Sequence, residues 1–403
     1  MRSGSPCHDR TVRAIDHDER RSRLGRRHLL VGEGGGASVE DVARRLVGLH
    51  ASDPATVFLA ARRRVPRLTV ADLERSLYED RTLLKVLAMR RTMFVVPLDL
   101  VPVLQASCTD TIAAQQLRRL VTELTKTELG AGAESWLDGV LAATLAALEA
   151  RGSATGTQLS TDVPDLRRKL KFGEGKAWAG EMSITTQALT ILSAQGHIVR
   201  GRPRGTLISS QYEWVATDRW LDAEPPPMPA DEARVELVRR WLAAFGPATL
   251  DDVQWWTGWG KGVTKAALGA LDLAEVTLAE GRVGLVLADD LEPVAPPDPW
   301  VALLPSLDPT AMGWKERYWY LGPHRERLFD RNGNIGPSAW CDGRIVGGWA
   351  QRPDGDVVVH LLEDVGAEAA AALAAEADVV RAWLGDVVVR ARFPTPLERE
   401  LIA

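Results

Sequence analysis

The chain has 403 residues, which is too long for one ordinary hydrophobic core and predicts about two to four domains. Its hydrophobic share of 45% and charged share of 26% are those of a globular protein, and no apolar run is long enough to span a bilayer. The net charge of −5 means that any surface for nucleic acid must be a local basic region.

Residues 1–27 are polar and charged, without the apolar segment of a secretion signal. We interpret residues 1–23 as a disordered lead-in whose arginines are solvated rather than bound to nucleic acid. The cysteines, Cys7, Cys108 and Cys341, form neither a CxxC pair nor a zinc-binding spacing, and the seven histidines are isolated in the sequence. The sequence therefore predicts no disulfide framework, no metal, no cofactor and a cytoplasmic location.

The segment 47–55, VGLHASDPA, is the first candidate site. It lies between a glycine that can end a helix and a proline that keeps the preceding residue out of the α region, so an extended backbone is expected. In an extended segment His50 and Ser52 share a face, with Asp53 beside them. An imidazole, a hydroxyl and a carboxylate so placed can hold and activate one water molecule. The alternative is that His50 and Asp53 only cap helices, with Asp53 as the N-cap of a helix over residues 54–64.

Residues 24–130 are expected to form a first, degenerate winged-helix unit. Three helical segments precede residues 83–97, LLKVLAMRRTMFVVP, which we interpret as one strand. Arg90 and Arg91 lie in the middle of that strand and are candidate DNA contacts.

Residues 131–223 predict a second unit more clearly. A third helix over residues 183–195 is followed directly by a β-hairpin whose tip, RGRPRG, is basic. A basic tip at this place is typical of a wing that contacts the phosphate backbone, which makes Arg200, Arg202 and Arg204 candidate DNA contacts. The alternative is an ordinary exposed turn.

Residues 228–290 repeat the plan as a third unit. The order helix, GPAT connector, helix, glycine–tryptophan turn, helix and hairpin indicates a winged helix whose third helix covers residues 261–271. We interpret Trp255, Trp256 and Trp259 as core and helix-packing residues rather than as platforms for stacked bases.

Residues 298–403 are mostly β in pattern, with Asp-Gly turn signals at 342–343 and 354–355, and fit a small closed or half-closed barrel. Before most of these strands lies LLPSLDPTAMGWKER, in which Lys315 and Arg317 are candidate DNA contacts.

These segments, in this order, resemble the AlkZ/YcaQ-like winged-helix DNA glycosylases from about Leu24 to the C-terminus. The resemblance is carried by VGLHASDP, RRTMFVVP, LLPSLDPTAMGWKER and CDGRIVGGW. It implies an α+β fold of tandem winged-helix units followed by a C-terminal β-barrel-like module, C-shaped around DNA. It also implies a cofactor-free enzyme, expected to be a monomer, that removes N7- or N3-alkylated, bulky or cross-linked purines from duplex DNA.

The family's catalytic motif is two glutamines, or a glutamine and an aspartate, separated by one residue, and the matching positions here are His50 and Ser52. By resemblance, His50 accepts a proton from the attacking water, Ser52 shares that water, and Asp53 orients His50 or stabilises the sugar cation. The alternative function is a non-catalytic winged-helix DNA-binding protein or regulator, although the sequence shows neither a ligand-binding nor a dimerisation domain.

Overall fold

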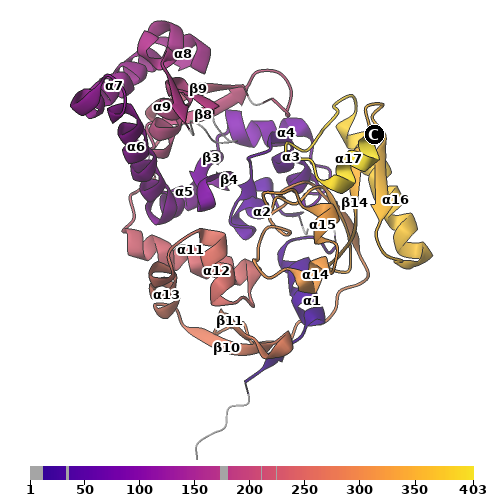
Figure 1. Cartoon of the computed structure of the whole chain (residues 1–403). Helices are drawn as coiled ribbons and strands as arrows, with labels where there is room; N and C mark the ends of the chain where they lie inside the picture. The colour runs from indigo at the N-terminus through magenta and orange to yellow at the C-terminus, as the bar shows by residue number, and fades with distance from the viewer. Residues whose placement is uncertain (1–11, 33–35, 173–179, 210, 224) are drawn as a thin grey trace, which may run out of the picture.

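The computed structural model describes residues 12–32, 36–172, 180–209, 211–223 and 225–403 (Figure 1). The fold is mixed α+β. Figure 1 shows a first unit in the middle of the molecule, a second and a third unit on one side of it, and the C-terminal region on the other. Within the described residues, no helix combines the length and the apolar character needed to cross a membrane.

The first unit contains short helices and a three-stranded sheet. Its elements are α2 (Val39–Arg45), β2 (Leu49–His50), α3 (Pro54–Arg62), α4 (Val70–Glu74), β3 (Leu83–Ala88) and β4 (Thr92–Pro97). Ser38 and Thr69 each form a capping box with an aspartate three residues later, which fixes where α2 and α4 begin. The strands pair in the order β2-β4-β3, so the segment after β2 lies beside β4.

The prediction of one strand over residues 83–97 is wrong, because the chain reverses within it. Met89–Arg91 form a tight turn between β3 and β4, and Arg90 and Arg91 have φ angles of 54° and 59°. Positive φ is uncommon for arginine, so the sequence gives no turn signal here. The two arginines therefore lie at the tip of a hairpin rather than on the face of a strand.

The second unit has the expected order of helices followed by a hairpin. A continuous helical run leads into it: α5 (Val101–Leu104), a π-helical segment (Gln105–Thr109) and α6 (Asp110–Thr125). The unit itself comprises α7 (Ala133–Arg151), β5 (Ser153–Ala154), α8 (Gly156–Asp162), α9 (Ile184–Ala194), β8 (Ile198–Pro203) and β9 (Tyr212–Ala216). Its sheet order, β5-β9-β8, repeats that of the first unit.

The sequence pattern also predicts helices over residues 164–170 and 124–129, and both predictions are wrong. Residues 164–170 form only a short turn of helix, Pro164–Arg167, before strand β6 (Lys169–Phe172) pairs with β7 (Gly180–Ser183). Residues 124–129 are not a separate helix, because α6 ends at Thr125 and turns follow.

The third unit matches its predicted elements. These are α11 (Ala230–Phe245), α12 (Leu250–Thr257), α13 (Lys261–Gly269), β10 (Leu273–Leu278) and β11 (Val283–Leu287). Thr249 and Asp252 form the capping box that begins α12. A strand from the N-terminal segment, β1 (Ala14–Ile15), adds to β10 in parallel.

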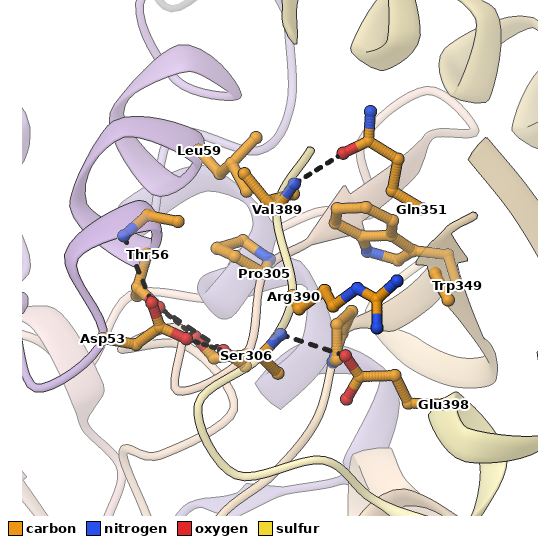
Figure 2. A pocket seen from close by; sticks show the side chains of 14 residues that line it. Asp53, Thr56, Leu59, Pro305, Ser306, Trp349, Gln351, Val389, Arg390 and Glu398 are labelled. Carbon is orange, nitrogen blue, oxygen red and sulfur yellow. Dashed lines mark hydrogen bonds between the residues drawn. The ribbon is translucent and has the colours of Figure 1, made fainter. Parts of the chain in front are cut away.

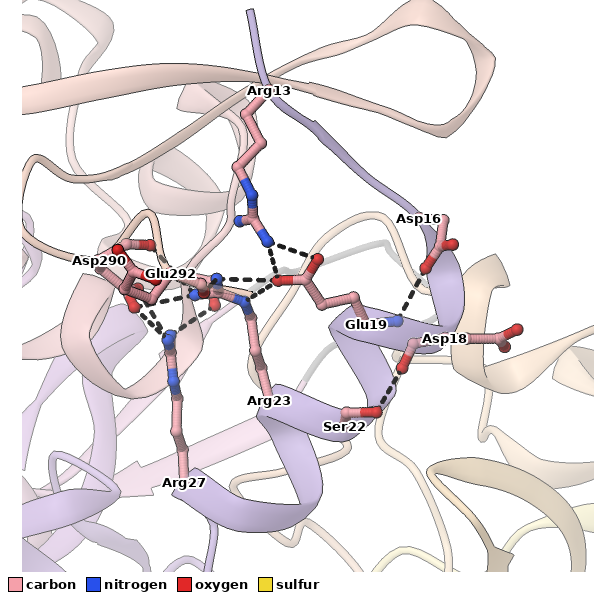
Figure 3. Close-up of polar contacts among 10 residues, drawn as sticks. Arg13, Asp16, Asp18, Glu19, Ser22, Arg23, Arg27, Asp290 and Glu292 are labelled. Atoms are coloured by element: carbon pink, nitrogen blue, oxygen red, sulfur yellow. Dashed lines mark hydrogen bonds and ion pairs between the residues drawn. The ribbon is translucent and has the colours of Figure 1, made fainter. Parts of the chain in front are cut away.

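The expected disorder of residues 1–23 is wrong from residue 14 onward, whereas residues 1–11, with Cys7, lie outside the described residues. Helix α1 (His17–Arg27) follows β1 and docks on the third unit. Figure 3 shows the reason: Arg23 and Arg27 both form ion pairs with Asp290, at 2.8 and 2.6 Å. The charges that suggested a solvated segment are satisfied inside the protein.

The C-terminal region contains a four-stranded sheet that does not close, so of the two predicted forms, a closed or a half-closed barrel, the closed one is wrong. Its strands are β12 (Val301–Leu304), β13 (Ser338–Cys341), β14 (Arg344–Gln351) and β15 (Val357–Leu361), antiparallel and in that order. The long helix α16 (Gly366–Leu384) packs on both β12 and β15, the two edge strands, instead of a further strand closing the sheet. The sequence pattern predicts a last strand over residues 387–393, but these residues are irregular chain that precedes α17 (Pro396–Ile402).

Buried polar contacts fix the segment between β12 and β13 against the first unit. The Arg64 guanidinium donates to both oxygens of Asp308 at 2.8 Å, and both side chains are fully buried. The His28 Nδ1 lies 2.8 Å from the Thr310 hydroxyl, and the Thr56 hydroxyl donates to the Ser306 carbonyl at 2.8 Å. These contacts bring the chain that leads to Lys315 and Arg317 toward the segment after β2.

Candidate functional site

A cavity of about 600 Å³ lies where the first unit, the third unit and the C-terminal region meet. Its wall includes His50 and Ser52 from the segment after β2, Arg90 from the β3–β4 tip, Trp255 from α12, and residues 315–317. Five of the ten site residues predicted from the sequence, His50, Ser52, Arg90, Lys315 and Arg317, are thus brought together. A volume of this size is within the range of small-ligand sites, roughly 300–1,000 Å³.

His50 is held by β2, where it pairs with Phe94 of β4, and only 4% of its surface is exposed. The Ser52 backbone N–H donates to its Nδ1 at 3.4 Å, which places the ring proton on Nε2. Burial, followed by the nearby charge of Arg90, lowers the pKa of His50 to about 3. The imidazole is therefore neutral at pH 7 and can donate a hydrogen bond through Nε2–H to a molecule in the cavity.

Ser52 is half-buried beside His50 on the cavity wall. Its hydroxyl oxygen accepts a hydrogen bond from the Met93 backbone N–H at 3.4 Å, so the hydroxyl proton is available to a second partner. The two side chains together present two donors to the cavity, the Nε2–H of His50 and the hydroxyl of Ser52.

Asp53 is not part of this wall. Its carboxylate caps α3 by accepting from the Ala55 N–H at 3.2 Å, as the capping alternative predicted. The same carboxylate accepts from the Arg392 N–H at 2.9 Å and the Ser306 hydroxyl at 3.3 Å. It faces a separate cavity of about 20 Å³, shown in Figure 2, and burial raises its pKa. In this structure, the carboxylate thus joins three segments of the fold and does not contact His50.

Arg90 and Arg317 both stack on the indole of Trp255. Their guanidinium carbons lie 4.0 and 4.5 Å from the ring centroid, which are distances typical of cation–π contacts. Burial and the neighbouring Arg317 lower the pKa of Arg90 to about 10, and Arg90 remains cationic at pH 7. Lys315 lies on the same wall and forms an ion pair with Asp251 at 3.1 Å.

Arg91 lies beside this site. It is exposed and lines a neighbouring cavity of about 460 Å³, which adjoins the first cavity at Arg90. The second cavity lies between the β3–β4 tip, the π-helical segment before α6, and the turn between α12 and α13. Basic residues thus line both cavities that meet at Arg90.

The three arginines of the second hairpin are placed elsewhere. Arg202 forms ion pairs with Glu74 and Glu79 of the first unit, at 2.7 and 3.1 Å. Arg204 forms an ion pair with Glu213 at 3.3 Å, and Arg200 packs over the ring of Tyr212. In this structure they contact the protein itself and do not join the 600 Å³ cavity.

Sequence reasoning missed Trp255 as a residue of the site. Its neighbour Trp256 is 4% exposed and belongs to the core, as predicted, whereas Trp255 is half-buried and lines the cavity. Helical periodicity could have separated them, because Val253, Trp256 and Thr257 share one face of α12 and Trp255 lies off it. Arg325 on the same wall was also missed, and no sequence signal distinguished it.

The described part of the chain contains no group of three histidine, cysteine, aspartate or glutamate side chains placed to hold a metal ion. The donors and cations of the cavity suit a water molecule, a base edge or a phosphate.

Comparisons with known proteins agree with this architecture. A family described as "DNA glycosylase AlkZ-like" matches residues 43–383. The chain is 28% identical over 332 residues to an "Interstrand DNA cross-link repair glycosylase" of Streptomyces sahachiroi, which covers 77% of this chain and 82% of that protein. The solved structure of the Streptomyces sahachiroi DNA glycosylase AlkZ superposes with a TM-score of 0.69 at 22% identity, covering 93% of this chain and 98% of that one, and supports the fold. Because the family match spans most of the sequence, the protein belongs to the AlkZ-like family of DNA glycosylases.

Proposed function

We propose that the protein hydrolyses the N-glycosidic bond of alkylated purines in duplex DNA, and that the reaction takes place in the cavity lined by His50 and Ser52. The single observation that carries the proposal is the meeting of these two donors with Arg90, Lys315 and Arg317 in one cavity. The similarity to an interstrand cross-link repair glycosylase extends the proposed substrates to bulky and cross-linked purines.

The proposed DNA-binding architecture is a set of winged helices. Each of the three units has helices followed by a hairpin, and the first two share the sheet orders β2-β4-β3 and β5-β9-β8. We propose that the three units and the C-terminal sheet form a C-shaped cleft around one duplex, and that the protein acts as a monomer. The arginines at the β3–β4 tip would line the inner side of that cleft.

The reaction does not require the protein to protonate the leaving base. A purine alkylated at N7 or N3 is cationic, so it accepts the electron pair of the breaking C1′–N bond without being protonated. The sugar becomes oxocarbenium-like, and a water molecule must attack C1′ as in glycoside hydrolysis. The main task is to place that water, and its proton passes to solvent once the C1′–O bond has formed.

We assign water placement to His50 and Ser52. The lowered pKa of His50 and the hydrogen bond at its Nδ1 make it a weak base, so its role is to donate Nε2–H to the water oxygen. Ser52 orients the same water by accepting one of its protons at the hydroxyl oxygen, which has a second lone pair beside the one that accepts from the Met93 N–H. One lone pair of the water therefore stays free to attack C1′. This assignment replaces the expectation that His50 removes a proton from the water. Asp53 is then a positioning residue, because it follows Ser52 directly in the chain and its side chain bonds the start of α3 to residues 306 and 392.

The test is release of free base from duplexes that carry a single N7-alkylguanine, with a small and a bulky adduct, and from a cross-linked duplex. We expect His50→Ala to lower the single-turnover excision rate by about 100-fold, because misplacing a reacting group by about 1 Å costs on that order. Binding to the same duplex should remain within about twofold, because His50 is buried and makes no charged contact.

His360→Ala is the matched control, because His360 is an exposed histidine on β15 outside the cavity wall. It should excise at the rate of the unmodified protein. Equal rates for His50→Ala and the unmodified protein, at equal DNA binding, would refute the assigned role of His50. Binding without release of any of these bases would refute the proposed substrate class.

A further inference from the structure

The guanidinium groups of Arg90 and Arg317 both lie over the indole ring of Trp255, at 4.0 and 4.5 Å from its centroid, and we call these three side chains the Arg90–Trp255–Arg317 stack. The three side chains come from different parts of the chain: the β3–β4 tip, helix α12 and the segment before α14 (Tyr318–Leu321). Two like charges therefore converge on one ring on the cavity wall.

Neither guanidinium has a carboxylate within ion-pair distance among the described residues. Arg317 is 6% exposed, and its Nη2 has no hydrogen-bond partner there, although its Nε donates to the Trp314 carbonyl at 2.7 Å. The Nε of Arg90 is likewise buried without a partner. A buried cation without a counter-charge is costly, so this arrangement is maintained at the expense of stability.

The acids near the stack are already occupied. Glu316 forms an ion pair with Arg282 at 3.4 Å, and Asp251 with Lys315 at 3.1 Å. Asp252 is fully buried, and its two oxygens accept hydrogen bonds from the N–H groups of residues 315, 316 and 249 and from the Thr249 hydroxyl. Asp252 therefore acts on Arg317 only at a distance, and no carboxylate among the described residues pairs with either guanidinium, so both can accept an anion from outside the protein.

The chemistry of the cavity favours a phosphate over the lesion base at this place. An N7-alkylated purine is itself cationic, so it is expected to lie away from the part of the wall that carries Arg90, Lys315, Arg317 and Arg325, while the sugar reaches the water at His50 and Ser52. A guanidinium over a ring keeps its N–H groups in its own plane, and those that reach the cavity can bind phosphate oxygens.

We propose that the Arg90–Trp255–Arg317 stack binds one backbone phosphate that flanks the target nucleotide. The bound phosphate fixes the sugar so that C1′ faces the water held by His50 and Ser52. This inference rests on the proposed function, and it defines Arg90 and Arg317 as residues that position the substrate rather than react with it.

The test is equilibrium binding to a duplex with a tetrahydrofuran abasic analogue, in which one phosphate at a time is replaced by an uncharged methylphosphonate. We expect the unmodified protein to lose about tenfold in affinity at one linkage, or two adjacent ones, beside the analogue. Arg90→Gln and Arg317→Gln should lose a similar factor on the natural backbone, and the replacement at that linkage should then have no further effect on their binding.

Arg91→Gln is the matched control, because Arg91 is the exposed neighbour of Arg90 in the same tip, and it should keep the position-specific loss. Trp255→Leu is a second variant that removes the stacking surface but no charge, so it should reduce the specific loss even if Arg317→Gln folds poorly. Equal losses at every linkage, or additive losses in the arginine variants, would overturn the inference. The binding assay does not depend on base release. If the protein shows the position-specific loss of affinity but releases no base, only the proposed function is refuted. If the protein releases base but shows no position-specific loss, only the phosphate contact of the stack is refuted.

Discussion

The β3–β4 hairpin of the first unit and the β8–β9 hairpin of the second unit have the same place in the same topology, but their arginines have different partners. At the β3–β4 tip, Arg90 stacks on an indole in a cavity and has no carboxylate partner in the described chain. At the β8–β9 hairpin, Arg202 and Arg204 form ion pairs with three glutamates. Leu207, near the second tip, is 4% exposed and belongs to a hydrophobic cluster that the first unit shares with the second unit and the C-terminal region.

The difference shows that basic residues in a hairpin are not sufficient evidence of a nucleic-acid contact. Arg202 and its partners Glu74 and Glu79 lie more than 100 residues apart in the chain, and only the packing of the two units brings them together. In the second unit the hairpin joins two units of the fold. In the first unit the cation of the corresponding hairpin has no carboxylate partner among the described residues, and we propose that it binds DNA.

The comparison between paired and unpaired arginines is sharpest at Arg64, whose fully buried guanidinium pairs with Asp308. We expect Arg64→Met to lower the free energy of unfolding by about 3–5 kcal/mol, because it leaves the Asp308 carboxylate buried without its partner. Urea unfolding followed by tryptophan fluorescence measures this loss.

The control for Arg64→Met is the double variant with Asp308→Leu, which removes both charges. It should be more stable than either single variant, since no uncompensated charge remains. A single variant within about 1 kcal/mol of the unmodified protein would contradict the role given to this pair. In contrast, Arg90→Gln should not destabilise the protein, because Arg90 has no counter-charge to leave behind.

Local signals in the sequence identified much of the helical architecture. In the sequence, Ser38 and Thr249 are each followed by an aspartate three residues later and Thr69 is a candidate N-cap, and all three residues cap helices in the structure. The hairpins of the second and third units were also predicted, because their strands and turns are local patterns. His50 and Ser52 were placed on one wall for the same reason, since alternation in a short extended segment is local.

Features that depend on distant contacts were not predictable. The turn at Arg90 and Arg91 has no glycine or asparagine, and its positive φ angles are maintained by the surrounding fold. The predicted barrel is an open sheet because α16 covers its edge strands, and hairpin signals alone cannot distinguish these outcomes. Trp255 joined the site only because α12 packs next to the first hairpin.

Lys85 on β3 provides a pH test of the contact between the two hairpins. Its ammonium donates to the Tyr78 hydroxyl at 2.6 Å and lies 4.7 Å from the ring of Tyr212 on β9. Burial, and next the nearby charge of Arg200, lower its pKa to about 7 in spite of the opposing effect of Glu74. Between pH 7 and the ordinary lysine pKa near 10.5, Lys85 therefore holds its proton in the unfolded chain but not in the folded one. The free energy of unfolding thus rises with pH by about 1.4 kcal/mol per pH unit.

We expect Lys85→Met to remove this rise of the free energy of unfolding with pH, measured by urea unfolding at pH 7, 8 and 9. At pH 7 the variant should also be more stable than the unmodified protein. Below pH 7 both states hold the proton, and Lys85 contributes no further slope. Lys126→Met is the control, because Lys126 is largely exposed and its replacement should leave the slope unchanged. An unaltered slope in Lys85→Met would show that the ammonium is not desolvated between the hairpins.

The smallest effects are expected at the ion pairs of the second hairpin. Arg202→Gln and Arg204→Gln should each change the free energy of unfolding by less than about 1 kcal/mol, because exposed ion pairs contribute little. They should also leave the dependence of duplex binding on salt unchanged, whereas Arg91→Gln should reduce the slope of log K against log [KCl] by about one phosphate contact. Fluorescence anisotropy of a labelled duplex across a KCl series measures both. If Arg202→Gln reduces the salt slope as much as Arg91→Gln does, Arg202 must leave its glutamate partners and contact DNA. The two hairpins would then share one function.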